Sequence, residues 1–244
     1  MQKIVTFLKN SRFGLLPLFG IVYLAVSTLL RMSLLASSWE ATRTTVWGLC
    51  QILFVGALYD VVFYLYFSVF FAFLLLLLPE FVYRSKIYKY STFFFVFLFL
   101  YGTYFVTLAE WLFWDEFKTR FNFIAIDYLV YTDEVFQNIY ESYPLGWIFL
   151  AIFIVAISTF FLLKRPLILV LQVKEKFSHR LAASAVVFSL ALCSYFFIGQ
   201  SWRGLSDNNY VNELGSSGPY QFVAAFRNNS LDYKTFGSVE KERP

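Results

Sequence analysis

Five long apolar runs, separated by polar segments, organise this 244-residue chain. A helix that crosses a bilayer needs roughly 20 consecutive apolar residues, because the hydrocarbon layer is about 30 Å thick and a helix rises about 1.5 Å per residue. The runs that meet or approach that length are residues 13–35, 46–78, 91–112, 147–163 and 181–199. The pattern therefore predicts an all-α membrane protein with five transmembrane helices within residues 1–199.

The first two runs each have an alternative interpretation. The first follows Lys3, Lys9 and Arg12, as the core of a cleaved signal peptide would, but it is longer than the about 7–15 residues typical of such a core. We expect an uncleaved first helix. The second run contains Gly56 and Asp60. It is expected to form one long tilted helix or a helix with an extramembrane extension, and a pair of re-entrant pieces is less favoured.

The polar sequence between the third and fourth runs, residues 113–144, holds six acids against two bases. We call it the acidic segment. Apolar and aromatic side chains recur in it at steps of three and four: Phe113, Phe117, Phe121, Ile124, Tyr128, Tyr131, Val135 and Ile139. This period predicts an amphipathic helix over 113–143 that lies on the membrane surface with its aromatic face down. A simple connector is the alternative, and Asn122-Phe123 is a candidate break into two pieces.

Orientation follows from the distribution of Lys and Arg among the loops. Residues 1–12, 79–90 and 164–180 carry three, three and five bases, against at most one acid each. The alternate loops are poorer in bases: Arg31 and Arg43 with Glu40 in the first, and the acidic segment in the second. The rule places the N-terminus in the cytoplasm and the acidic segment outside. Five crossings also bring the chain after residue 200 to the outer side.

Composition supports the membrane interpretation and restricts the chemistry. The chain is 59% hydrophobic and 15% charged, whereas soluble domains average about 45–50% and 25%. The net charge of +4 resides in the cytoplasmic loops and requires no nucleic-acid partner. Cys50 and Cys193 lie in apolar runs, and His179, the only histidine, lies in a basic loop. No disulfide framework, catalytic apparatus or metal site is therefore predicted in this chain.

Two acids in or beside the apolar runs require an explanation. Asp60 lies 14 residues beyond the start of its run, near mid-membrane, where a charge costs at least about 2.5–3.5 kcal/mol. A hydrogen bond to a tyrosine such as Tyr59 or Tyr64, or to one on another helix, is favoured over a polar contact on a lipid or substrate path. Glu110 precedes Trp111, and we expect it at headgroup depth within an interfacial aromatic belt.

The chain after the fifth run has a pattern of its own. Residues 210–214 predict a short helix, and Gly215 to Pro219 a turn-rich hinge. Residues 220–226 are apolar enough to pack against the acidic segment or against another domain. We interpret residues 200–244 as an extracytoplasmic linker.

Two blocks resemble one known family. The acidic segment contains DEFKTRFNFIAIDYLVYTDEVFQNIYESYP, and the tail contains NNYVNELGSSGPYQFVAAFRNNSLDY. Both are similar to the membrane domain and exit linker of the lipoteichoic-acid-synthase-like phosphoglycerol transferases of the sulfatase/alkaline-phosphatase superfamily. The candidate lipid or interdomain contacts are Asp60 and Glu110 from the runs, and Arg120, Asn122, Asp127, Arg227 and Asn228 from the two blocks.

The resemblance implies a function that this chain does not complete. In that family a sulfatase-like outer domain follows the linker, with a Thr nucleophile and a divalent metal of the Mn or Mg type. Residues 1–244 contain no such ligand set, so catalytic, metal and cofactor residues are expected in a missing domain. The resemblance also implies a bacterial cytoplasmic membrane, and an anionic phospholipid such as phosphatidylglycerol as partner.

Two functions remain open at this point. The first is a membrane anchor and lipid-facing module of a phosphoglycerol-transferase-type enzyme of envelope polymer synthesis. The second is a freestanding scaffold or regulator that binds lipid or a partner through the acidic segment. A transporter is a weaker third, because Asp60 is the one polar group expected at mid-membrane and the sequence shows no internal repeat.

Overall fold

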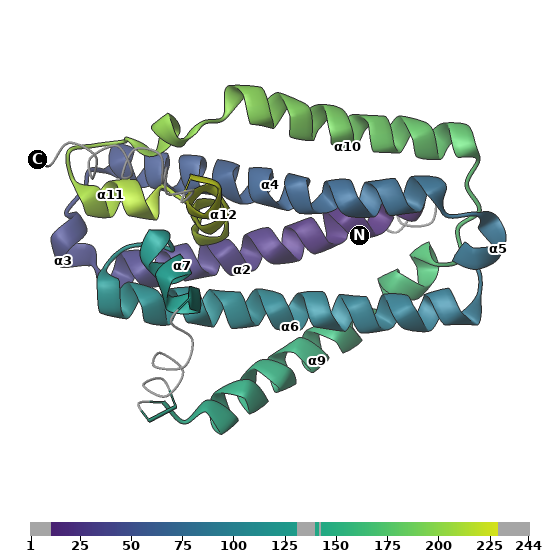
Figure 1. Cartoon of the computed structure of the whole chain (residues 1–244), viewed down its shortest axis with the longest axis horizontal. Helices are drawn as coiled ribbons and strands as arrows, with labels where there is room; N and C mark the ends of the chain where they lie inside the picture. Colours follow the sequence, from purple (N-terminus) through teal and green to yellow (C-terminus); the bar gives the residue numbers. More distant parts are fainter. Residues whose placement is uncertain (1–10, 131–139, 142, 229–244) are drawn as a thin grey trace, which may run out of the picture.

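Five long helices form the body of the protein (Figure 1). The computed structural model describes residues 11–130, 140–141 and 143–228, and all regular structure within these ranges is helical. The long helices are α2 (Leu15–Ser37, preceded by the 3-10 turn η1, Arg12–Gly14), α4 (Val46–Leu77), α6 (Lys86–Phe117), α9 (Leu145–Val170) and α10 (Phe177–Phe197). Each is long and apolar enough to cross a membrane. The prediction of an all-helical chain with five such helices is confirmed.

Shorter elements connect the long helices and complete the chain. Between the long helices lie α3 (Trp39–Thr42), α5 (Glu80–Tyr83) and α7 (Phe123–Val130). After α10 come η2 (Gln200–Arg203), α11 (Asn209–Leu214) and α12 (Gly218–Asn228). The short helix predicted over 210–214 is therefore confirmed. Residues 229–244 of the predicted linker lie outside the described residues.

Side-chain caps determine where two of the long helices begin. Thr45 accepts a hydrogen bond from Gly48 N at 3.2 Å before α4, and Ser85 accepts one from Tyr88 N at 3.0 Å before α6. Such caps satisfy backbone donors that a helix start leaves unpaired. The long second run is one continuous helix of 32 residues, α4, so the re-entrant alternative is wrong.

The long helices pack in the order α10, α4, α2, α6 and α9. A cluster that includes Phe19, Leu100 and Ala156 joins α2, α6 and α9. A second cluster, with Leu34, Ile52, Trp114 and Leu214, joins α2, α4 and α6 to α11. The order differs from the chain order because α4 lies between α2 and α10, which leaves α9 at the edge (Figure 1).

Large apolar side chains cover the outside of the bundle. Examples on the two outer helices are Phe161 and Leu162 of α9, and Leu192, Phe196 and Phe197 of α10, all more than half exposed. Exposing so large an apolar surface to water would be unfavourable, whereas lipid chains can solvate it. The exposed surface is therefore that of a multi-pass membrane protein.

The predicted surface helix over 113–143 is wrong in its first part. Helix α6 continues through Phe117 and stops at Lys118, whose left-handed backbone (φ 54°) reverses the chain. Phe113 lies 5.3 Å from Phe121 between ring centroids, so these aromatics pack across the break. The regular spacing of these aromatic residues therefore reflects a contact between two segments and does not indicate one continuous helix. A separate helix, α7, begins at Phe123, so the candidate break at Asn122-Phe123 is confirmed. The part of the predicted stripe within residues 131–139 lies outside the described residues.

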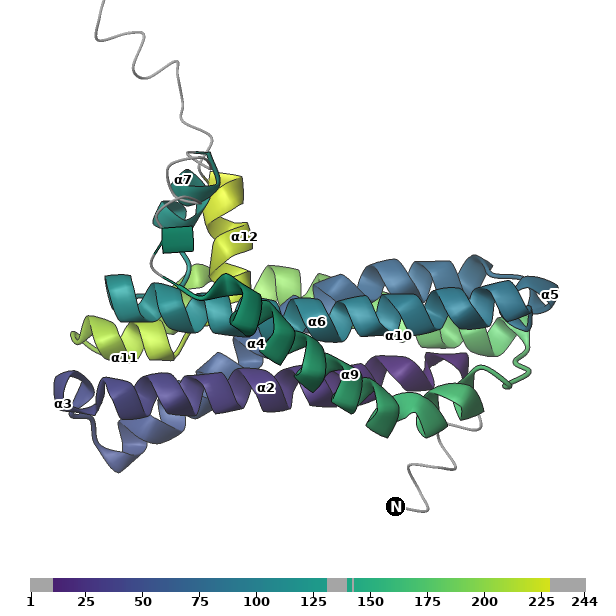
Figure 2. The same ribbon diagram turned by 90° about the horizontal axis from the view of Figure 1, so that it is seen from below.

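Helices α7 and α12 form a pair that projects crosswise from the bundle (Figure 2). They lie side by side, and α12 also contacts α4. Phe121, just before α7, lies 6.2 Å from Phe222 of α12 between ring centroids. The predicted packing of residues 220–226 against the acidic segment is confirmed. Both blocks of the family resemblance thus meet at one end of the bundle.

Candidate functional site: a buried ion-pair network

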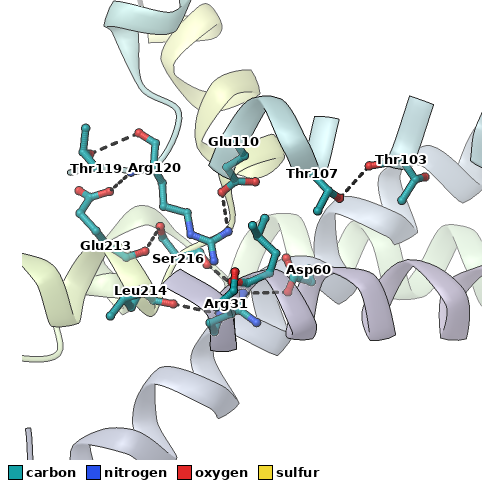
Figure 3. A network of polar contacts seen from close by, with 12 residues as sticks. Arg31, Asp60, Thr103, Thr107, Glu110, Thr119, Arg120, Glu213, Leu214 and Ser216 are labelled. Atoms are coloured by element: carbon teal, nitrogen blue, oxygen red, sulfur yellow. Dashed lines mark hydrogen bonds and ion pairs between the residues drawn. The ribbon is translucent and has the colours of Figure 1, made fainter. Parts of the chain in front are cut away.

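Arg31 of α2 and Asp60 of α4 form an ion pair between the long helices (Figure 3). Arg31 Nη2 lies 2.8 Å from Asp60 Oδ2, and neither side chain is exposed. A single unpaired charge between transmembrane helices would be unfavourable, so each side chain compensates for the other. The pair fixes α2 against α4 at this level.

The expected tyrosine partner of Asp60 is wrong. The Tyr59 hydroxyl donates to Gly199 O at 2.7 Å, and the Tyr64 hydroxyl donates to Leu16 O at 2.6 Å. Sequence reasoning missed Arg31 because it was counted as a loop base. The available signal was its position inside the first apolar run, residues 13–35, where a cation needs a buried acid.

Arg31 also holds the chain that follows α10. We call residues 200–228 the C-terminal segment. Arg31 Nε donates to Leu214 O at 3.0 Å, and Nη2 donates to Ser216 O at 3.0 Å, 183 and 185 residues further along the chain. Gly56 of α4 lies against the guanidinium, where an added Cβ would overlap Arg31. One buried side chain therefore joins α2, α4 and the turn between α11 and α12.

Glu110 of α6 and Arg120 form a second buried pair. Arg120 Nη1 lies 2.6 Å from Glu110 Oε1; Arg120 is fully buried and Glu110 is 1% exposed. The reversal at Lys118 makes this pair possible, because it returns Arg120 toward the helix that it has just left. Gly218, the first residue of α12, packs against the Glu110 carboxylate and leaves no space for a Cβ. Glu110 is therefore covered by protein and paired, which the sequence did not indicate, and its position at headgroup depth stays a prediction.

Glu213 of α11 extends the second pair into the C-terminal segment. Its Oε2 accepts a hydrogen bond from Arg120 N at 3.1 Å, and its Oε1 lies 3.8 Å from Arg203 Nη2. Arg203 Nη1 in turn donates to Gln221 Oε1 at 3.1 Å. Polar contacts thus continue from α6 to η2, α11 and α12.

Several buried polar atoms around the two pairs have no hydrogen-bond partner within the described protein. They are Arg31 Nη1, Asp60 Oδ1, and Arg120 Nε and Nη2. Ser216 and Ser217, which the sequence assigned to a hinge, are fully buried here. Of the predicted hinge over Gly215 to Pro219, residues 215–217 form a packed turn and Gly218 and Pro219 begin α12. The turn lies inside a region unusually polar for the interior of a membrane bundle.

The chemistry of this network is that of a structural junction. Two arginines face two carboxylates. The other bonds of Arg31 go to backbone carbonyls of the C-terminal segment, and the backbone N–H of Arg120 donates to the Glu213 carboxylate. Among the described residues, no group of three His, Cys, Asp or Glu side chains is placed to hold a metal ion. The network is therefore suited to fixing segments to one another.

A groove of about 530 Å³ lies beside the network, between the start of α7, η2 and α12. Its walls are Asn122, Phe123, Gln200, Arg203, Gln221, Ala224 and Ala225. Asn122, a sequence-predicted site residue, also caps α7, because its Oδ1 accepts a hydrogen bond from Ile124 N at 2.9 Å. The remaining residues predicted from the sequence belong to the helices that form the groove: Asp127 to α7, and Arg227 and Asn228 to the end of α12.

The structure therefore divides the seven candidates into two groups. Asp60, Glu110 and Arg120 belong to the buried network, where the protein covers their side chains. Asn122, Asp127, Arg227 and Asn228 belong to the α7 and α12 pair. Contact of any of them with lipid or another domain stays a prediction.

A smaller polar cluster lies at the opposite end of the bundle. Arg12 pairs with Glu80, its backbone N–H donates to Glu175 at 3.0 Å, and its guanidinium lies 4.0 Å from the centre of the Tyr83 ring. The Tyr83 hydroxyl donates to Val170 O at 2.8 Å, and burial raises the pKa of this phenol above its ordinary value. These contacts connect the start of α2 to α5 and the end of α9.

Comparisons of the chain with models of known protein families, with curated proteins and with solved structures find no match. The resemblance to lipoteichoic-acid-synthase-like phosphoglycerol transferases thus gains no support from them, and it enters below as a proposal.

Proposed function

We propose that this chain is the membrane anchor and lipid-facing module of a phosphoglycerol-transferase-type enzyme of cell-envelope polymer synthesis. The catalysis would come from a sulfatase-like extracytoplasmic domain, in the same or a separate polypeptide. That domain would supply the nucleophile and a divalent metal of the Mn or Mg type. An anionic phospholipid such as phosphatidylglycerol would be the partner of the module described here.

One observation supports this proposal most directly: buried ion pairs fix the C-terminal segment to the bundle. Arg31 binds the carbonyls of Leu214 and Ser216, and Glu110 packs against Gly218 at the start of α12. A domain attached after α12 would therefore leave from a rigid position. Holding an active site at a fixed height above the membrane increases the effective concentration of a lipid substrate, without chemistry from the anchor.

Activity measurements with and without the proposed domain test this function. We expect the protein purified from its own membranes, with an antibody to the C-terminal segment, to release phosphoglycerol from labelled phosphatidylglycerol when Mn²⁺ is present. Residues 1–244 alone, expressed in a host without such enzymes, are expected to release none, because the described residues provide no metal site. Release by residues 1–244, or none by the natural preparation, would contradict the proposal.

The proposed location is a bacterial cytoplasmic membrane, with the N-terminus in the cytoplasm and α11 and α12 outside. Single cysteines at Lys174 and Ser206, both exposed, test it after Cys50 and Cys193 are replaced by serine. An impermeant maleimide applied to intact cells is expected to label position 206 and to reach position 174 only after lysis. The opposite pattern would invert the topology.

A freestanding scaffold or regulator is the second candidate. The observation that favours it is the exposure of Phe123 and Phe226 on the projecting α7 and α12 pair, where a partner protein could bind. The same purification separates the two functions. An associated polypeptide without a sulfatase-like domain, together with no phosphoglycerol release, would favour the scaffold.

A further inference from the structure

The groove between α7, η2 and α12 has the lining of a ligand site. We propose that it binds the phosphate-bearing polar group of an anionic amphiphile at the membrane surface. The inference rests on the proposed lipid-facing function, and it adds the location of the contact and the residues that make it. Arg203 and Gln221 are the principal ligands.

Buried donors in the groove lack partners in the described structure. Gln221 is 5% exposed; its Oε1 accepts a hydrogen bond from Arg203, while its Nε2 has no partner. The Nε2 atom of Gln200, from the opposite wall, is also buried without one. Because a buried unpaired donor is unfavourable, two of them in one groove favour an acceptor-rich ligand such as phosphate.

Arg203 provides the positive charge. Its side chain is 38% exposed, and its acidic neighbour, Glu213, lies at 3.8 Å and also accepts a hydrogen bond from Arg120 N. The guanidinium therefore has a loose ion pair and remains accessible from the groove. Arginine is well suited to phosphate, because its planar N–H groups match two phosphate oxygens.

The surroundings of the groove favour a ligand that is part of a membrane. Phe123 lines the groove, and Trp202, Val223 and Phe226 belong to η2 and α12, which form it; each of the four is more than two-fifths exposed. Aromatic side chains are typical of the membrane–water interface. The groove volume of about 530 Å³ is in the usual range for a small-molecule site, roughly 300–1,000 Å³. A ligand whose polar group binds inside the groove and whose apolar chains lie along these aromatic and aliphatic side chains would match both the polar lining and the apolar surroundings.

Native mass spectrometry of the full chain tests the site. The protein is released from nanodiscs that contain equal amounts of phosphatidylglycerol and phosphatidylcholine, and the retained lipid is counted. We expect about one phosphatidylglycerol per chain, and a loss of roughly tenfold in retention for Arg203→Gln, because a charge-assisted bond is removed. Arg43→Gln is the matched control, because Arg43 is an exposed arginine of the loop between α3 and α4. This variant is expected to retain lipid normally.

Two further variants separate binding from folding. Ala224→Phe fills the groove from α12 and removes no polar group. Gln221→Leu removes the unpaired donor together with the acceptor of the Arg203 hydrogen bond. Both are expected to lose phosphatidylglycerol while their thermal unfolding in detergent stays near that of the unmodified protein. If a variant unfolds early, only the other is compared.

The remaining outcomes each decide the inference. Competition by free sn-glycerol 1-phosphate without lipid retention would identify a soluble ligand of the same chemistry. Equal losses in Arg43→Gln and Arg203→Gln would show general surface attraction and overturn the site, as would unchanged retention in Ala224→Phe. The measurement involves no catalysis, so the site and the enzyme-anchor function can fail separately.

Discussion

Replacing Arg31 with leucine is expected to lower the free energy of unfolding by about 3–5 kcal/mol, because Asp60 would become an uncompensated buried charge. Both members of the pair are fully buried between α2 and α4. Titration with sodium dodecyl sulfate in mixed micelles, followed by helix content, measures the change. Arg165→Leu, at an exposed position of α9, is the control and is expected to change stability by less than about 1 kcal/mol.

The double variant Arg31→Leu with Asp60→Leu separates the two contributions of Arg31. Replacing a buried ion pair with apolar residues is often close to neutral, so most of the lost stability should return. The carbonyls of Leu214 and Ser216 would still lack their donor. Hydrogen exchange in α11 and α12 is therefore expected to stay fast in the double variant. Slow exchange there would show that Arg31 does not hold the C-terminal segment.

Alanine at Gly56 or Gly218 is expected to destabilise the protein by about 1–3 kcal/mol each, because an added Cβ overlaps a buried charged group. At Gly56 that group is the Arg31 guanidinium, and at Gly218 it is the Glu110 carboxylate. Neither group can move freely, since each is held in an ion pair. The same titration in mixed micelles measures both.

Gly102→Ala is the matched control for these two variants. An added Cβ at Gly102 of α6 meets no heavy atom within 4 Å. Alanine is the better helix former by about 0.5–1 kcal/mol, so this variant is expected to be neutral or slightly stabilising. If all three variants behaved alike, helix propensity would explain them and close packing around the network would not.

The bundle was predictable from the sequence, because run length alone identifies helices that can cross a membrane. The faces by which the helices contact one another could not be predicted in this way. A helix such as α4 is apolar all round, so its pattern does not reveal which side meets α2 or that Asp60 faces Arg31. Pairing between residues 29 apart in the chain depends on how two helices pack, and single-sequence periodicity carries no information about that.

The acidic segment shows a different limit. Phe113, Phe117 and Phe121 have helical spacing, but the left-handed backbone at Lys118 ends α6 before Phe121 is reached. Lysine is not a typical residue for that conformation, so the sequence indicated a break only at Asn122-Phe123 and not the reversal at Lys118. Ser216 and Ser217 were predicted to lie in a solvated hinge, but both are buried. Arg31 donates a hydrogen bond to Ser216 O, and the sequence pattern does not reveal that contact. The sequence found Glu110, Arg120 and Asn122 but not their arrangement.

The central claim is that buried charges fix the C-terminal segment to the membrane bundle. The distance between spin labels at Glu40 and Val223, both exposed, tests it by pulsed electron paramagnetic resonance in bilayers, with Cys50 and Cys193 replaced by serine. We predict one narrow distance distribution in the otherwise unmodified chain and a broad one after Arg31→Leu. A broad distribution before that change, or a narrow one after it, would contradict the account.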